Sequence, residues 1–287
     1  MTATISYEFF PPRSLDASFR LWDTINALKH TDPSFVSVTY GAGGTTRQLT
    51  HEAVGAIGKH TGLSVAAHLT CVDASREETL EIAHSYAEAG VTKIVALRGD
   101  PPKGAQGFQA QSNGFQNSVE LIEALAQTGK FDLTVGAYPD VHPEAPDAAA
   151  NIEWLKRKID AGASQAITQF FFEADTFFRF RDACVAAGID APILPGILPI
   201  QSWKGAKRFA ERCGTPIPAS LAQAFETAER DDRTDLLATA VCTELCTKLM
   251  EGGVEHLHFY TLNDPKLTRD VVHALGLAPE ISLEKVA

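Results

Sequence analysis

The chain has 287 residues, of which 45% are hydrophobic and 21% are charged, and its formal net charge is −11. This composition is typical of a globular protein that buries a sizeable core and needs no disulfide or metal staples. The negative charge argues against nucleic acid and anionic membranes as main partners, and no run of about 18 apolar residues predicts a membrane span.

In chain order, eight apolar segments rich in Val, Ile, Leu and Phe are expected to be strands, and each precedes a helical segment. The strands are expected over residues 4–10, 35–41, 64–71, 93–100, 133–139, 165–172, 192–199 and 256–263. The helices are expected over residues 15–28, 46–60, 75–89, 118–128, 147–161, 176–187, 202–212, 219–230, 234–251 and 266–275. Residues 103–116 have no periodicity and are expected to form a long loop, which in a compact domain is usually functional or disordered.

These strands show little period-two alternation, which is typical of a parallel sheet buried by helices on both faces. Eight strand–helix repeats over this length predict a (β/α)8 TIM barrel, with extra helices near the C-terminal end. A doubly wound open sheet is the alternative. Because no linker-like shift in composition occurs, residues 1–287 are expected to form a single barrel domain.

The cysteines favour a reducing compartment. Cys71, Cys184, Cys213, Cys242 and Cys246 are scattered and contain no Cys-x-x-Cys motif, so we interpret them as reduced thiols in the cytoplasm. Cys242 and Cys246 share one face of an expected helix, where packing is favoured over a metal pair. Residues 1–10 lack the basic start and long apolar run of a signal peptide.

Polar side chains gather where the expected strands end, and in a (β/α)8 barrel the active site lies at that end. The strand at 93–100, for example, ends in Arg98-Gly99-Asp100 and is stopped by two prolines. The candidates from strand ends are Glu8, Thr39, His68, Thr70, Arg98, Asp100, Tyr138 and Gln169, and loops add Arg13, Arg47, His142 and Glu144.

Glu8 and Asp100 are the acidic candidates. Glu8 lies between Tyr7 and Phe9 in the sequence, and an aromatic setting is expected to desolvate the carboxylate, raise its pKa and make it a proton donor near neutral pH. The alternative for Glu8 is an ion pair with an arginine such as Arg98 or Arg13. Asp100 is open to three interpretations: partner of Arg98, helix cap, or a charge against a cationic intermediate.

The histidines allow both structural and functional interpretations. His68 is either a satisfied core histidine or a cofactor contact. His256 and His258 share one side of the last strand, but a metal pair is disfavoured because His256 is near the strand start and no third ligand is obvious. No P-loop, His-Glu-x-x-His or Gly-x-Ser-x-Gly motif occurs, and no lysine ends a strand, which disfavours a Schiff-base aldolase.

Several long stretches closely resemble the bacterial methylenetetrahydrofolate reductases. They are residues 7–13 (YEFFPPR), 35–42 (FVSVTYGA), 68–71 (HLTC), 95–100 (VALRGD), 138–139 (YP), 141–145 (VHPEA), 156–158 (KRK), 166–172 (AITQFFF), 195–199 (PGILP) and 258–263 (HFYTLN). The resemblance implies a barrel that holds FAD, takes hydride from NADH or NADPH, and passes it to 5,10-methylenetetrahydrofolate in ping-pong order, possible in either direction. It also implies a homo-oligomer.

The resemblance also implies roles by matching position. Glu8 would be the general acid that opens the folate ring, and Asp100 would tune the flavin and favour the cationic iminium. The implied FAD contacts are Thr39, Tyr40, Ala42, His68, Arg98, Gly99, Asp100, Tyr138, His142, Ala145, Asn151, Arg157 and Lys158. The implied substrate contacts are Glu8, Thr39, Gln169 and Phe209.

Three positions depart from the family pattern. Asn151 replaces an aspartate that holds part of FAD in relatives, and Gly205 replaces a glutamine near the substrate. Asp264 replaces an arginine that pairs with the glutamate tail of folate. We hypothesise that Lys266 or Arg269 binds that tail instead, or that the tail is held loosely. Two other readings stay open, namely a metal-dependent barrel hydrolase and a non-catalytic flavin or folate binding protein.

Overall fold

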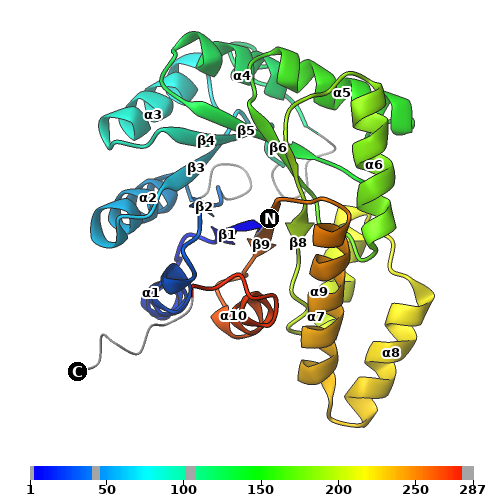
Figure 1. Cartoon of the computed structure of the whole chain (residues 1–287). Coiled ribbons are helices and arrows are strands. Elements are labelled where there is room, and N and C mark those ends of the chain that lie inside the picture. Colours follow the sequence, from blue (N-terminus) through cyan, green and yellow to red (C-terminus); the bar gives the residue numbers. More distant parts are fainter. Residues whose placement is uncertain (1–2, 41–45, 101–107, 280–287) are drawn as a thin grey trace.

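The computed structural model describes residues 3–40, 46–100 and 108–279. Within these ranges one parallel sheet runs in the order β7-β6-β5-β4-β3-β2-β1-β9-β8, and helices surround it (Figure 1). The strands are β1 (Thr4–Phe9), β2 (Phe35–Val38), β3 (Val65–Thr70), β4 (Lys93–Leu97), β5 (Asp132–Ala137), β6 (Gln165–Thr168), β7 (Ile193–Leu194), β8 (Gly196–Ile197) and β9 (His256–Tyr260). The helices are α1 (Leu15–Leu28), α2 (Arg47–Thr61), α3 (Arg76–Glu88), α4 (Ser118–Gln127), α5 (Ala148–Asp160), α6 (Ala174–Ala186), α7 (Trp203–Cys213), α8 (Ala219–Arg230), α9 (Thr234–Glu251) and α10 (Pro265–Ala274), with a short 3-10 turn at Lys29–Thr31.

The segment around Pro195 closes the sheet into a barrel. The single strand expected over 192–199 is divided into β7 and β8, because Pro195 has no N–H to donate to a ladder. β7 pairs with β6 and β8 pairs with β9, and the Pro195 carbonyl accepts from the His258 amide at 3.1 Å. Together β7 and β8 form the seventh strand, so the (β/α)8 barrel is confirmed and the open doubly wound sheet is excluded.

Local signals set most helix ends. Ser75 caps α3 in a capping box with Glu78, and Asp147 caps α5 through the Ala150 amide at 2.8 Å. α8 and α9 begin and end where the sequence predicts. The strands end earlier than predicted: β6, for instance, ends at Thr168 instead of residue 172.

Alternate residues of each strand face two different cores. Tyr7 and Phe9 point outward into the large layer between strands and helices. Phe35 belongs to a smaller cluster inside the barrel with Val95 and Ile167. Since successive side chains of a strand point to opposite faces, Ser6 and Glu8 face the barrel interior. Fully burying each large apolar side chain contributes roughly 1.5–3 kcal/mol, and both layers hold the strand ends in place.

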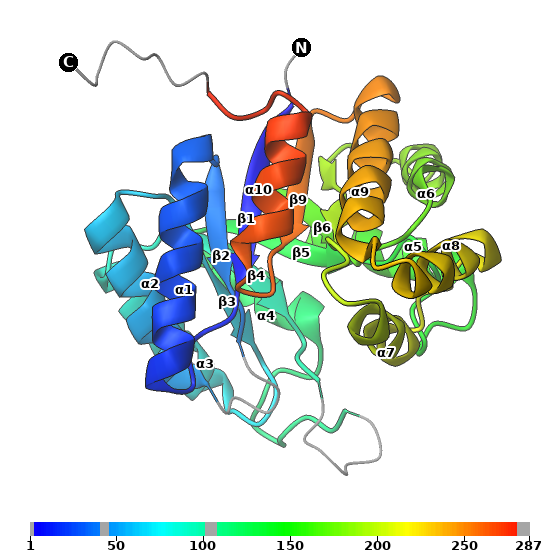
Figure 2. The ribbon, with the colours of Figure 1, turned by 90° about the horizontal axis from the view of Figure 1, so that it is seen from below.

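The strands run parallel, so all their C-terminal ends lie at one end of the barrel, and α7 lies toward that end in the side view (Figure 2). All five cysteines are free, and four of them are buried. In the described part of the chain, no helix is long and apolar enough to cross a membrane.

Candidate active site

Glu8, His68 and His258 meet at the centre of the barrel. They come from β1, β3 and β9, and their side chains share the interior. Oε2 of Glu8 lies 3.3 Å from Nε2 of His68 and 3.9 Å from Nε2 of His258. The Glu8 side chain keeps 16% exposure, whereas the two imidazoles are 7% and 0% exposed, so the carboxylate is the accessible member of the cluster.

The pKa of Glu8 is lowered from 4.5 to about 2, so the raised pKa expected from the sequence is wrong. Burial is the largest single influence and raises the pKa, but the polar contacts and charges of His258 and His68 together outweigh it. The aromatic neighbours Tyr7 and Phe9 point away from the carboxylate into the helix-facing layer. The setting of Glu8 is therefore made by strands β3 and β9 and not by its neighbours in sequence.

A chain of hydrogen bonds runs from this cluster toward the N-terminal end of the barrel. Ser6 Oγ lies 2.7 Å from His258 Nδ1 and 2.7 Å from His256 Nε2, and His256 Nδ1 lies 2.7 Å from Thr4 Oγ1. Phe35 stacks on both imidazoles, with centroids 5.7 and 5.8 Å away. Burial lowers the pKa of His256 to about 4 and is also the largest cause of the lowered pKa of His258, so burial favours the neutral form of both rings.

Arg98, Tyr138, His142 and Glu144 form a rim beside this centre. Arg98 pairs with Glu144 through two donors, one of them Nη2 to Oε1 at 3.0 Å, so Arg98 does not pair with Glu8. Tyr138 and His142 meet edge to face at 4.4 Å. The Glu144 amide donates to His142 Nδ1 at 3.0 Å, and burial lowers the pKa of His142, so Nε2 carries the proton and can donate to a ligand.

Asn151 ties this rim together. Its Nδ2 donates to the Tyr138 carbonyl at 2.9 Å, and its Oδ1 accepts from the His142 amide at 3.4 Å. An aspartate could not make the first of these bonds. The Ala145 amide also donates to the His142 carbonyl, at 2.8 Å. In this chain Asn151 therefore positions the loop that carries His142.

Asp100 and Gly99 follow β4. Asp100 is exposed, and its charge contributes to raising the pKa of Tyr138 to about 12, where burial is the larger cause. Gly99 has φ of 89°, and a Cβ there would lie 2.6 Å from Val72 Cγ1. Glycine is therefore required at position 99 by conformation and by space.

Lys158 is a buried cation. Its ammonium donates to the Gly136 carbonyl, and burial lowers its pKa from 10.5 to about 8. No acidic side chain of the described residues pairs with it. Arg157 is exposed instead, and its guanidinium lies 4.7 Å above the Trp154 ring. Lys158 therefore lies against β5. In the described chain, Arg157 contacts none of the other candidate residues.

The remaining candidates follow β2, β6 and α7. The Thr39 amide donates to the Phe9 carbonyl at 2.9 Å, and Tyr40 is buried beside it. The Gln169 amide donates to the Ala137 carbonyl at 2.7 Å, next to Tyr138. Phe209 stacks on Phe170 at 5.0 Å. Ala42, which the resemblance places at FAD, lies outside the described residues, as do residues 41–45 and 101–107.

Some buried polar atoms at these strand ends lack a well-formed hydrogen bond in the described protein. Thr70 Oγ1 is one, and His68 Nε2 and His258 Nε2 have only the Glu8 carboxylate beside them, at 3.3 and 3.9 Å. A buried polar atom without a partner costs about 1–3 kcal/mol, so a set at one end of a barrel indicates a ligand site. In the described ranges no group of three or more His, Cys, Asp or Glu residues is arranged to hold a metal ion.

The sequence predicted that Glu8, His68 and the rim residues lie at one end of the barrel, but it considered His258 only as a disfavoured metal ligand and did not single out Tyr260. His258 and Tyr260 face the same interior as Glu8, and Tyr260 Oη donates to the Thr168 carbonyl at 2.6 Å. Burial raises the pKa of Tyr260, and the charges of Glu8 and the Tyr138 side chain add to it, so Tyr260 joins the centre to the rim. The sequence does contain a pattern that indicates this arrangement: His256, His258 and Tyr260 occupy alternate positions of one strand and therefore face the same side.

Comparisons with known proteins identify the family of this chain. The family model described as Methylenetetrahydrofolate reductase matches residues 1–276. The 5,10-methylenetetrahydrofolate reductase of Pectobacterium carotovorum subsp. carotovorum is 43% identical over 279 residues, covering 97% of this chain and 92% of that protein. The enzyme of the same name from Escherichia coli (strain K12) is 44% identical over 276 residues, covering 96% of this chain and 91% of its own.

A more distant relative and a solved structure also match over most of this chain. Methylenetetrahydrofolate reductase (NADH) 1 of Arabidopsis thaliana is 34% identical over 292 residues, covering 98% of this chain and 49% of that protein. A solved Clostridium thermocellum protein that binds two copies of 5-methyl-5,6,7,8-tetrahydrofolic acid has a TM-score of 0.62 at 14% identity, covering 97% of this chain and 95% of its own, and it supports the fold alone. On the family match and the bacterial relatives, the chain belongs to the methylenetetrahydrofolate reductase family of enzymes.

Proposed function

We propose that this protein reduces 5,10-methylenetetrahydrofolate to 5-methyltetrahydrofolate, using NADH or NADPH as reductant and FAD as cofactor. The observation that carries the proposal is the accessible Glu8 carboxylate held against His68 and His258 at the end of a closed barrel. This arrangement places a proton-exchanging cluster where a (β/α)8 enzyme has its active site. The reductases named among the relatives support the assignment.

The residues present fit a flavin. The buried Thr70 Oγ1, which has no hydrogen-bond partner in the described chain, offers a hydrogen bond, and His142 Nε2 offers another donor. The buried Lys158 suits a phosphate group. The residues proposed to hold FAD are Thr39, Tyr40, Ala42, His68, Arg98, Gly99, Asp100, Tyr138, His142, Ala145, Asn151, Arg157 and Lys158.

When bound, FAD would supply the hydride-transfer chemistry between the nicotinamide and the folate methylene carbon. We propose that the two substrates use the site in turn, which gives ping-pong kinetics. Thr39, Gln169 and Phe209 would contact the substrate. A cytoplasmic location and a homo-oligomer stay predictions from the sequence.

Glu8 would deliver the proton that opens the folate ring. The free protein holds this carboxylate ionised, so Glu8 would take up a proton from solvent when bound ligands desolvate the site, and would then pass that proton to the folate. Ser6 links His258 to His256 and fixes the ring orientation. General acid catalysis of this kind contributes typically ~10²–10⁴-fold.

Asp100 would act by its charge. It is exposed at the end of β4, next to Tyr138, where a carboxylate favours a cationic iminium over the neutral closed ring. It is not paired with Arg98, whose partner is Glu144, so its charge is available to a ligand.

The test is an anaerobic spectrum of the purified protein. We expect a yellow protein whose flavin absorbance falls with NADH or NADPH and returns when 5,10-methylenetetrahydrofolate is added. A colourless protein with bound metal would support a hydrolase instead. A yellow protein that neither nucleotide reduces would support a non-catalytic flavin-binding protein.

A further inference from the structure

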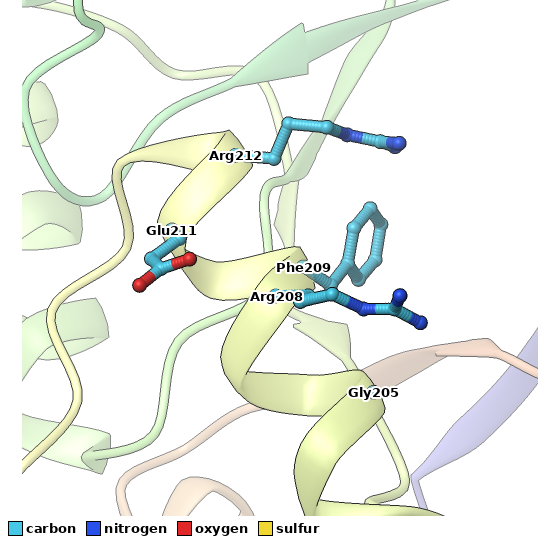
Figure 3. Close-up of a pocket in the computed structure, with 5 residues that line it drawn as sticks. All are labelled: Gly205, Arg208, Phe209, Glu211 and Arg212. Carbon is cyan, nitrogen blue, oxygen red and sulfur yellow. The ribbon is translucent and has the colours of Figure 1, made fainter.

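Helix α7 is strongly cationic in an acidic chain. It carries Lys204, Lys207, Arg208 and Arg212 against the single acid Glu211, whereas the whole chain has a net charge of −11. Figure 3 shows that the side chains of Arg208, Phe209 and Arg212 project to the same side of the helix, while Glu211 points to the other. The helix therefore presents an aromatic ring between two guanidinium groups.

This face of α7 lines two adjoining hollows. The first, of about 660 Å³, is lined by Gly205, Arg208, Phe209, Glu211 and Arg212. The second, of about 280 Å³, is mainly apolar and shares Gly205, Phe209 and Arg212 with the first. Its other lining residues are Phe10, Leu198, Pro199, Ile200, Gln201, Ser202, Ala206 and Leu262, several of which follow the ends of β1, β8 and β9. The mainly apolar hollow therefore lies between the C-terminal end of the barrel and the cationic hollow.

The two arginines are available to an anion. In the described ranges neither Arg208 nor Arg212 has an ion-pair partner, unlike Arg98, which pairs with Glu144. The guanidinium of Arg212 lies 5.5 Å from the Phe209 ring, which keeps it beside the hollow. Two exposed cations without partners, next to a hollow in an acidic protein, favour a negatively charged ligand group.

We infer that this hollow binds the carboxylates of the glutamate tail of folate, with Arg208 and Arg212 as the binding residues. The inference rests on the proposed function. A folate continues from its pterin into an aromatic ring and then into carboxylates, the same order as the mainly apolar hollow, Phe209 and the two arginines. Arginine suits this role because its planar fork can bind a carboxylate through two parallel hydrogen bonds.

Lys266 and Arg269, which the sequence suggested as partners of the glutamate tail, form ion pairs with acidic side chains instead. Lys266 Nζ lies 2.6 Å from Asp235 Oδ2, and Arg269 Nη2 lies 3.5 Å from Asp270 Oδ1. Neither Lys266 nor Arg269 lines the hollows. Asp264, at the position where the family pattern has an arginine, caps α10 by accepting from the Lys266 amide at 3.1 Å. The change at residue 264 is thus accounted for by helix capping, and α7 supplies the cations.

Gly205 keeps the two hollows open. It lies inside α7, where a Cβ would meet nothing closer than Ser202 at 3.5 Å, so neither crowding nor backbone conformation demands glycine. Yet it lines both hollows, and a long side chain there would project into them. The missing side chain leaves room for the tail to reach Arg208 and Arg212.

The experiment compares three ligands on the FAD-loaded protein: 5-methyltetrahydrofolate with one glutamate, the same compound with three glutamates, and 5-methyltetrahydropteroate, which has no glutamate. Binding is measured at equilibrium for the native chain and for the double variant Arg208→Gln/Arg212→Gln. Lys207→Gln is the matched control, because it removes one charge from the same helix but its ammonium lies 5.5 Å from the Trp203 ring, outside the hollows.

We expect the double variant to bind both glutamylated ligands roughly tenfold more weakly, since exposed arginine–carboxylate pairs are individually modest. Binding of the pteroate and the rate of flavin reduction by NADH should be unchanged, and Lys207→Gln should match the native chain. Equal weakening for all three ligands, or none for the glutamylated ones, would overturn the inference while the proposed reaction stands. A native protein that binds none of the three would overturn the proposed function as well.

Discussion

Oε2 of Glu8 on β1 lies 3.3 Å from Nε2 of His68 on β3, across the interior of the barrel. The two strands are not neighbours, because β2 lies between them in the sheet. The side chains meet because both strands direct them into the interior around which the sheet curves. The chemistry proposed for this protein therefore depends on the ring of strands as well as on the residues.

The hydrogen-bonded chain below Glu8 can be tested at Ser6. Ser6→Ala leaves His256 Nε2 and His258 Nδ1 without their shared partner in a buried setting, so we expect the free energy of unfolding to fall by about 1–3 kcal/mol. Flavin reduction by NADH should be retained and the folate half-reaction should slow. Urea unfolding and rapid-mixing absorbance measure the two effects.

Thr4→Val is the control for Ser6→Ala. It removes the contact with His256 Nδ1 at the exposed end of the same chain, where water can replace the hydroxyl. We expect a change within about 0.5 kcal/mol and no change in the folate half-reaction. Equal losses in both variants would show that Ser6 has no special position in the network.

The buried Lys158 predicts an unusual dependence of stability on pH. Its pKa is about 8 in the folded chain against 10.5 when unfolded, so between these values the unfolded chain binds more protons. Its contribution to the free energy of unfolding therefore rises with pH across that window, by at most about 1.4 kcal/mol per unit, and is constant below it. The measurement is the difference between native protein and Lys158→Met at pH 7 to 10, which isolates this one group.

The same lysine predicts proton uptake on flavin binding. A phosphate beside Lys158 would favour its charged form, so binding of FAD at about pH 8.5 should take up protons. Calorimetry in buffers of different ionisation enthalpy measures that uptake, and Lys158→Met should abolish it. Uptake that persists in the variant would place the phosphates elsewhere.

Substitution by alanine is expected to change the stability of the protein in opposite directions at Gly205 and Gly196. At Gly205 a Cβ meets only Ser202 at 3.5 Å, so Gly205→Ala should stabilise the protein by about 0.5–1 kcal/mol through helix propensity. At Gly196 a Cβ would lie 2.1 Å from the Thr168 carbonyl and 2.6 Å from the Tyr260 ring. Gly196→Ala should therefore destabilise the closure of the barrel, and thermal unfolding of both variants would show the difference in sign.

Much of the fold could be predicted from the sequence because its signals are local. The helices expected from residues 15, 75 and 147 begin within one residue of those positions, where Ser14, Ser75 and Asp147 cap them, and α8 spans the predicted residues. The apolar strands indicated a parallel sheet, and their number indicated the barrel. Pro195 could be recognised in the sequence as a residue that interrupts a strand. It could not be recognised as the point where the barrel closes, because closure depends on the pairing of the flanking segments with β6 and β9.

From the sequence one could predict which polar side chains gather at one end of the barrel, but not the electrostatics of that group. Glu8 was assigned a raised pKa from Tyr7 and Phe9, yet adjacent residues of a strand point to opposite faces. The groups that set its pKa are His68 and His258, which are 60 and 250 positions away. The register that pairs Ser6 with His258 joins the first and last strands, and no local pattern encodes it.

The most direct measurement is to follow both half-reactions of Glu8→Gln by rapid-mixing absorbance. The account predicts that NADH still reduces the flavin at a rate close to that of the native protein, because glutamine keeps the size and polarity of the side chain. Reoxidation by 5,10-methylenetetrahydrofolate should fall by ~10²-fold or more, since the variant has no carboxyl proton to donate. Equal loss in both half-reactions, or an unchanged folate half-reaction, would contradict the role of Glu8 as proton donor.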